Sequence, residues 1–261
     1  MKWIVGFIVL CLYVNGIPLF LPPAEIAFWV AYWAGFFLLT ILLAKFLLGL
    51  KGISGFGLQR HSNWLVNLGL GLLIGMSIYA VKYAIFYGSG KFQVTGFMPA
   101  QYILEILMMG AIAMLFSSLL NDIVIRGYVF AAGTKFNFLG MFILAAGILY
   151  VLDDSWKAGF SWINVVFSAI LGFTFAYTVF NTGSIWMSFG LHWGGNMMFR
   201  VMYGFDGQGV LKLQNQVEGL SYDLISLGVT ALMFPIVYLV LKSRKALEGR
   251  EIAEASNRFK F

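Results

Sequence analysis

The sequence predicts an all-α protein, a polytopic transmembrane bundle of about eight helices. Of its 261 residues, 61% are hydrophobic and 11% are charged, whereas a soluble domain is typically about a quarter charged. The mean hydropathy is +0.86. Eight apolar runs approach the roughly 17–25 residues that a helix needs to cross the hydrocarbon core. They lie near 3–20, 26–48, 64–87, 102–120, 137–153, 161–181, 184–203 and 223–242.

The first run, in MKWIVGFIVLCLYVNGIP, predicts a retained helix, because no small-x-small cleavage site follows its short apolar core. Pro18 interrupts this run, and the LPP sequence at 21–23 predicts a turn toward the second run. Cys11, the sole cysteine, lies inside the first run, which excludes a disulfide framework within the chain.

Small residues recur every four positions in several of the later runs. This spacing lets two helix backbones approach closely in lipid, where van der Waals contact drives association. We therefore expect the helices from 102 to 203 to form the tight core, with the first two and the last at its periphery. The small residues are Gly71 and Gly75; Ser168, Gly172 and Ala176; Gly190 and Gly194.

The connections are short, which predicts a single integral membrane domain over 1–261. The longest polar connection is 204–222, and a basic tail follows at 243–261. Most lysines and arginines fall on the side of this tail, which predicts that both termini are cytoplasmic. The net charge of +6 therefore indicates orientation and contact with membrane lipids, and we expect no nucleic-acid partner.

Polar side chains at membrane depth are the candidate functional residues, because an ionisable group in lipid is costly unless it has a partner, a cavity or water. Three groups stand out: Asn121, Asp122 and Arg126 after the fourth run; Asp153 and Asp154 at the end of the fifth; His192, Asn196 and Arg200 on the seventh. Two further charges, Lys82 and Glu105, are expected near helix ends, reaching toward the interface. The alternative for these two is a buried pair or a proton path.

Four-residue spacing groups these candidates further. His192, Asn196 and Arg200 share one helical face, and Asp122 with Arg126 can form an acid-before-base pair. A histidine at such a place can transfer a proton or donate to an oxyanion, and an asparagine can hold a carbonyl group or a water molecule. The alternative is that these side chains are polar contacts that hold helices together.

The segments NDIVIRGYVF, LYVLDDSW and TGSIWMSFGLHWGGNMM resemble the CPBP family, the CAAX-protease and bacteriocin-processing membrane proteins also called the Abi family. The resemblance covers roughly residues 55–205. That family carries a Glu-Glu-x-x-x-Arg motif, an aromatic-x-x-x-His motif and a His-x-x-x-Asn motif on successive membrane helices. His192 and Asn196 match the third motif, and Arg126 matches the first.

Other positions depart from the family pattern. Asn121 and Asp122 stand at the paired glutamates, and Tyr150 occupies the aromatic position with Asp154 where the histidine is expected. The resemblance implies an intramembrane endopeptidase of the bacterial plasma membrane, in which the first glutamate activates a water while histidine and asparagine stabilise the oxyanion. Asn121 has no carboxylate and cannot replace that general base.

The adjacent acids leave several alternatives open. Asp122 points roughly 100° further round the helix, which favours contact with Arg126 over contact with a reacting water. Asp154 can supply a base from the neighbouring helix, leaving His192 as a donor. An Asp122–Asp154–His192 zinc site, and hence a metalloprotease, is a further possibility, since carboxylate and imidazole groups both bind zinc.

Three functional hypotheses follow. The chain is an intramembrane endopeptidase with a variant acid that cleaves a membrane-embedded peptide or protein; or a non-catalytic family member that acts as a membrane regulator, scaffold or bacteriocin-immunity factor; or a small-solute transporter. Contact between Asp122 or Asp154 and His192 within a cavity would favour the enzyme. Pairing of the acids with Arg126 or Lys157 would favour the non-catalytic protein.

Overall fold

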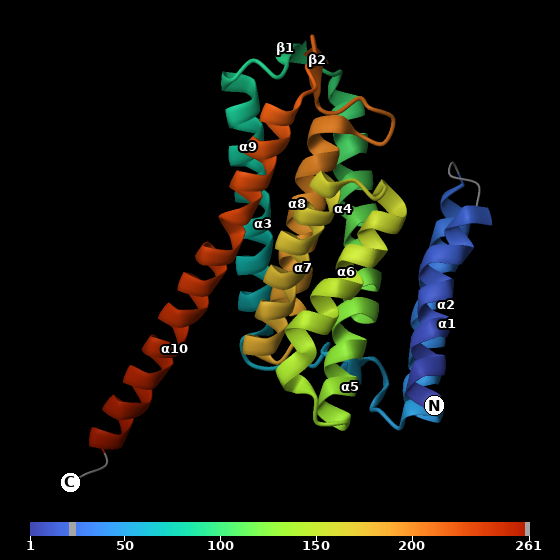
Figure 1. Ribbon diagram of the computed structural model, residues 1–261, viewed down its shortest axis with the longest axis vertical. Helices are drawn as coiled ribbons and strands as arrows, with labels where there is room; N and C mark the ends of the chain where they lie inside the picture. Colours follow the sequence, from blue (N-terminus) through green and yellow to red (C-terminus); the bar gives the residue numbers. More distant parts are fainter. Residues whose placement is uncertain (21–24, 259–261) are drawn as a thin grey trace.

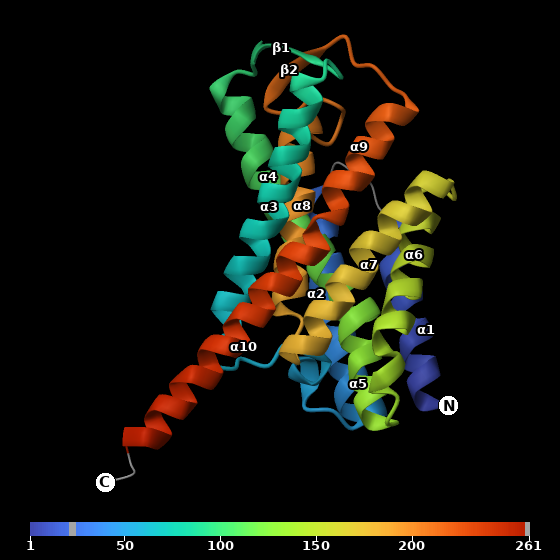
Figure 2. The same cartoon turned by 60° about the vertical axis from the view of Figure 1, so that its left-hand side comes forward.

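The computed structural model describes residues 1–20 and 25–258, with only the helical backbone of 246–258, so the LPP sequence at 21–23 lies outside the described residues. The chain forms a helical bundle with two short strands at one end (Figures 1 and 2). The helices are α1 (Lys2–Gly16), α2 (Ile26–Leu42), α3 (Trp64–Gly88), α4 (Ala100–Asp122), α5 (Val129–Lys135), α6 (Phe142–Ala158), α7 (Trp162–Thr182), α8 (Trp186–Tyr203), α9 (Leu220–Ala231) and α10 (Met233–Arg258). The strands are β1 (Gln93–Phe97) and β2 (Leu211–Gln214).

Among the described residues, seven helical segments are long and apolar enough to cross a membrane. These confirm seven of the predicted runs as candidate spans of an integral membrane protein. The remaining run, 184–203, forms α8, which carries His192, Asn196 and Arg200 and does not meet the same apolar criterion. A helix satisfies every backbone polar group inside its own segment, which is why apolar sequence in lipid takes this form.

The fourth run contains the main departure from the expected boundaries. The run was expected to end near residue 120, but α4 continues through a π-helical turn, Ile123–Tyr128, into α5. Together they form a 36-residue helical segment, Ala100–Lys135. The predicted end is wrong because the residues of the turn are all buried and extend the apolar core beyond the polar pair at its start.

The closest helix packing joins α3 to α8 (Figure 2). A Cβ atom on Gly71 or Gly75 would collide with the backbone of α8, and one on Gly190 or Gly194 would collide with the backbone of α3. The small-residue spacing therefore marks a close helix contact, as predicted. The tight core nevertheless includes α3, which precedes the 102–203 segment expected to form it.

Sequence-local signals set the limits of α7, which packs against α6. The Ser161 hydroxyl accepts a hydrogen bond from the backbone N–H of Asn164 at 3.1 Å, which satisfies one free donor at the helix start. Gly183 adopts a left-handed conformation (φ 66°) at the helix end, which glycine takes without steric cost. Gly172 lies in close contact with Tyr150 of α6, within the predicted small-residue pattern.

Helices α1 and α2 form a pair beside the rest of the bundle (Figure 1). Trp33 of α2 stacks on Phe116 of α4 with ring centroids 4.3 Å apart. Near the start of α1, the Tyr128 hydroxyl donates to the backbone oxygen of Trp3 at 2.6 Å. These contacts attach the pair to the same helical segment that carries the candidate site.

The last pass consists of α9 and α10, with a bend at Leu232. Pro235 lies in the first turn of α10 and has no backbone N–H to donate to the preceding turn, which explains the break. At the opposite end, β1 and β2 pair antiparallel, so part of the expected 204–222 loop is a strand. The start of α1 and the far end of α10 lie at the same end of the bundle (Figure 1).

Candidate functional site

The end of α4 and the π-helical turn after it place three candidate residues in the bundle interior. Such turns are rare and often occur at functional sites, because the extra residue changes where the side chains point. Asn121, Asp122 and Arg126 are all buried, and the Arg126 side chain has 0% exposure. Gly127 lies directly against the backbone of Phe56, where a Cβ atom would not fit. Arg126 therefore supplies a buried charge, and Gly127 allows the close contact with the backbone of Phe56.

Asp122 lies at the centre of a hydrogen-bonded network. Its Oδ1 accepts from Arg126 Nε at 2.6 Å and from the Ser188 hydroxyl of α8. Its Oδ2 lies 3.0 Å from His192 Nδ1. The ion pair expected from the four-residue spacing is therefore present, and both carboxylate oxygens have partners.

His192 is held in one orientation by this network. The Asp122 carboxylate can only accept, so a hydrogen bond between them requires the proton on Nδ1 and leaves the lone pair on Nε2. Arg126 Nη2 also lies 3.2 Å from Nδ1 and can donate to it only in the other tautomer. The imidazole ring contacts Tyr150 and Phe175, with centroids 5.8 and 5.4 Å away, and its side chain is 11% exposed.

Arg126 and Asn121 extend the network to a second carboxylate. Arg126 Nη2 donates to Asn121 Oδ1 at 3.2 Å, and Asn121 Nδ2 donates to Asp153 Oδ2 of α6 at 2.7 Å. Asp153 also accepts from Lys157 at 2.7 Å and from Asn15 of α1 at 3.1 Å. The acid that pairs with Lys157 is therefore Asp153. The Asn121 amide connects this pair to the buried Asp122–Arg126 pair.

The other candidates lie outside this network. Asp154 accepts from the Ser168 hydroxyl of α7. Asn196 Nδ2 donates to the Ser118 hydroxyl of α4 at 3.1 Å. Arg200 donates to the backbone oxygen of Gly204 at 2.9 Å and closes the end of α8. The structure thus joins Asn121, Asp122, Arg126 and His192, and places Asn196, Asp154 and Arg200 in separate contacts.

Two serines were missed in the sequence, although spacing could have indicated both. Ser188 lies four residues before His192, on the face that His192 shares with Asn196. Ser118 lies four residues before Asp122, on the same face of α4. Each hydroxyl supplies a hydrogen bond across the α4–α8 contact, which is the usual role of serine between membrane helices.

The described side chains do not fit a resident metal ion. In residues 1–20 and 25–245, no three histidine, cysteine, aspartate or glutamate side chains are arranged to hold one. The Asp122–Asp154–His192 group considered from the sequence is therefore not assembled, and the Asp122 oxygens already accept from Arg126 and Ser188 or face His192. We derive no reaction step through a metal ion.

Comparison with known proteins identifies the part of the chain that carries the motifs. No curated protein and no solved structure matched the chain. A family model does match, over a segment that runs from α4 to α8 and contains the network around Asp122 together with Tyr150, Asp154 and Asn196. Residues 103–198 match the model described as Rce1-like, type II CAAX prenyl endopeptidase Rce1-like, which confirms the resemblance to the CAAX-protease family of membrane proteins.

Proposed function

We propose that this chain is a non-catalytic CAAX-protease-like membrane protein that binds a membrane-embedded peptide or protein without cleaving it, as a regulator, scaffold or immunity factor. The observation that carries the proposal is the position of Asn121. Its amide stands at the place of the family's water-activating glutamate and is hydrogen-bonded at both ends, to Arg126 and to Asp153. An amide offers no basic oxygen that could take a proton from water.

Asp122 contacts His192, as expected of an enzyme, but it also pairs with Arg126, as expected of a non-catalytic protein, and it is poorly suited to replace the missing base. A general base must reach the reacting water with a free lone pair, and the Asp122 oxygens are engaged by Arg126, Ser188 and His192. Freeing this carboxylate would also separate a fully buried ion pair. Such a separation costs about 3–5 kcal/mol in proteins, because an uncompensated charge remains in the interior.

The same network supports a structural and binding role. It joins α4 to α8 through Asp122, Ser188 and His192, and joins α4 to α6 through Asn121 and Asp153. Hydrogen bonds between membrane helices fix which faces pack together. The polar residues that the family uses for chemistry would then hold the helices in the arrangement that a partner recognises.

An endopeptidase that uses Asp154 is the second candidate. Asp154 accepts only from Ser168 among the described side chains and keeps one oxygen free. Tyr150, one helical turn before it, contacts the His192 ring. A water between Asp154 and His192 would give a base from α6 and an imidazole from α8.

A cleavage assay separates the two candidates. The full chain is reconstituted in liposomes with a library of membrane peptides and compared with His192→Ala, with Asp154→Asn, and with Asn121→Glu combined with Asp154→His. We expect no cleavage by the wild type. Cleavage by the double variant alone would show a family scaffold from which the base has been removed.

Cleavage by the wild type would contradict the proposal, and the variants show how. Wild-type cleavage that disappears in both His192→Ala and Asp154→Asn, while both variants remain folded, would refute the non-catalytic proposal and identify a protease with Asp154 as its base. Cleavage that persists in both variants would indicate a contaminating protease. Lys157→Met, which removes an exposed lysine one turn after Asp153 in α6, is the control for general disturbance of this helix.

A further inference from the structure

Lys82 is a buried cation outside the network around Asp122. It lies on α3 about 9 Å from the helix end, from the rise of 1.5 Å per residue, and was expected to reach the interface. That expectation is wrong: Lys82 is only 5% exposed. Among the described residues its ammonium group has no hydrogen-bond acceptor and no carboxylate partner, whereas Glu105 lies exposed elsewhere.

Aromatic rings surround the Lys82 ammonium group. Its Nζ lies 3.8 Å from the centroid of Tyr79, 5.1 Å from that of Tyr83 and 5.5 Å from that of Phe167 of α7. Ring faces attract a cation but accept no conventional hydrogen bond from it. The three N–H donors of the ammonium group therefore remain available to a ligand that accepts hydrogen bonds.

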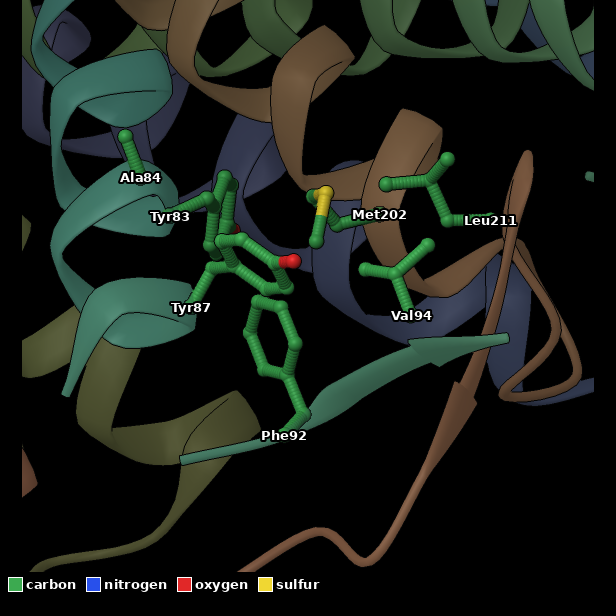
Figure 3. Close-up of a pocket in the computed structure, with 7 residues that line it drawn as sticks. All are labelled: Tyr83, Ala84, Tyr87, Phe92, Val94, Met202 and Leu211. Carbon is green, nitrogen blue, oxygen red and sulfur yellow. The ribbon is translucent and has the colours of Figure 1, made fainter. Parts of the chain in front are cut away.

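The residue next to Lys82 in α3, Tyr83, carries a buried hydroxyl without a partner among the described residues. The Tyr83 side chain is 5% exposed, and its hydroxyl makes no hydrogen bond within the described chain. Tyr83 also lines a groove of about 300 Å³ between α3, α8 and the two strands (Figure 3). Figure 3 shows Tyr83, Tyr87 and Phe92 on one side of this groove, with Met202, Val94 and Leu211 facing them.

We propose that this groove, Tyr83 and Lys82 form a binding site for an amphiphile with one apolar chain and a carboxylate head, such as a fatty acid. The apolar lining accommodates the chain. The carboxylate, which only accepts hydrogen bonds, receives one from the Tyr83 hydroxyl and one from the Lys82 ammonium group. These two donors match the two oxygens of the carboxylate, and the positive charge of Lys82 matches its negative charge. This site does not depend on the proposed function, since it shares no residue with the network around Asp122.

The test uses the full chain in nanodiscs of zwitterionic phosphatidylcholine and a decanoic acid that carries a photoreactive diazirine at its chain end. We expect saturable labelling of the segments around Phe92–Val94 and Met202–Leu211. Lys82→Met should weaken the apparent affinity about tenfold or more, because it removes a charged hydrogen bond. Tyr83→Phe should weaken the affinity about two- to tenfold, because it removes a neutral one.

Lys91→Met is the matched control. Lys91 also lies near this end of α3 and over two rings, at 5.1 Å from Phe86 and 4.8 Å from Tyr222, but it already donates to the Val217 backbone oxygen at 3.1 Å. We expect unchanged labelling in this variant, and unlabelled decanol should compete much less effectively than decanoate. A thermal unfolding curve checks that Lys82→Met remains folded.

A second readout observes the ammonium group directly. The NMR signal of ¹⁵N-labelled Lys82 Nζ, assigned by its loss in Lys82→Met, should shift when decanoate is added and stay in place when decanol is added. Labelling that is equal in Lys82→Met, Lys91→Met and wild type would overturn the proposal. Equal competition by decanol and decanoate, or an unchanged Lys82 signal at saturating decanoate, would also overturn it.

Discussion

Arg126 connects the buried Asp122 carboxylate with Asn121 and with the aromatic rings around it. It donates to Asp122 and Asn121, and its guanidinium carbon lies 5.0 Å from the ring centroids of Tyr150 and Phe175. Only its Nη1 lacks a partner within the described residues. A guanidinium group suits this position because its planar fork of donors points at Asp122 and Asn121 in fixed directions, whereas a lysine is a point charge on a flexible stem.

Removing Arg126 tests whether the ion pair stabilises the fold. Arg126→Met leaves Asp122 fully buried without its cation, and we expect the free energy of unfolding to fall by about 3–5 kcal/mol. Combining it with Asp122→Asn should recover a large part of this loss, because no charge then remains in the interior. Lys157→Met, at a pair whose lysine is 45% exposed, should change stability by about 1 kcal/mol or less. Denaturant titration in detergent micelles measures all three, and equal effects at Arg126 and Lys157 would contradict the expectation.

Asn121 permits a charge-exchange experiment. Asn121→Asp would place two carboxylates at the 2.7 Å contact with Asp153, which is unfavourable at low dielectric. We expect a loss of stability of about 2–4 kcal/mol, the scale of a broken buried hydrogen bond with an added like charge. Adding Asp153→Asn restores one amide and one carboxylate with their positions exchanged. Recovery in the double variant, measured by thermal unfolding, supports the contact, whereas additive losses would argue against it.

At the scale of helices, most spans could be predicted because lipid imposes the same requirement on each one, a long apolar run. Asn121 and Asp122 gave a misleading end to the fourth run because Asp153, the partner of Asn121, and Ser188 and His192, the partners of Asp122, are distant in the chain. Spacing within one helix gave the Asp122–Arg126 pair. It could not give the contact between Asn121 and Asp153, which depends on how α6 packs against α4.

The glycine contact between α3 and α8 leads to a prediction with a matched control. Gly75→Ala would drive a methyl group into the backbone of α8, whereas the same change at Gly69 meets open space. We expect Gly75→Ala to destabilise the fold by about 1–3 kcal/mol or more, as overpacking does. Gly69→Ala should be neutral or stabilise by up to about 1 kcal/mol, since alanine favours the helix. Denaturant unfolding measures the stability of the two variants. Equal stability would show that α3 and α8 pack less closely than the structure indicates.

At the scale of the whole molecule, the two ends of the chain lie together, as the eight predicted runs would place them (Figure 1). The start of α1 and the far end of α10 lie at one end of the bundle, and the two strands lie at the other (Figure 1). Composition alone identified the class of protein, because long apolar runs with so few charges are typical of helices that cross a membrane. It could not reveal the paired strands, because each is short and neither is more apolar than an ordinary loop.

Which end faces the cytoplasm follows from the distribution of basic residues and is the last prediction. Lysine and arginine cluster near the ends of the chain, so these should be cytoplasmic and the strands external. Starting from Cys11→Ser, which removes the sole cysteine, single cysteines are introduced as Ser62→Cys before α3, Ser243→Cys in α10 and Gln208→Cys near β2. None of the three changes alters a charge, so the charge distribution that orients the chain is preserved.

A membrane-impermeant maleimide applied to intact cells should label only the cysteine at 208. After lysis it should label all three, which checks that each position is accessible. The reverse pattern would place the termini outside and would show that the basic tail does not orient the chain. Labelling at 62 and 243 on opposite sides would be more serious, because it would require an odd number of passes between them and contradict the bundle itself.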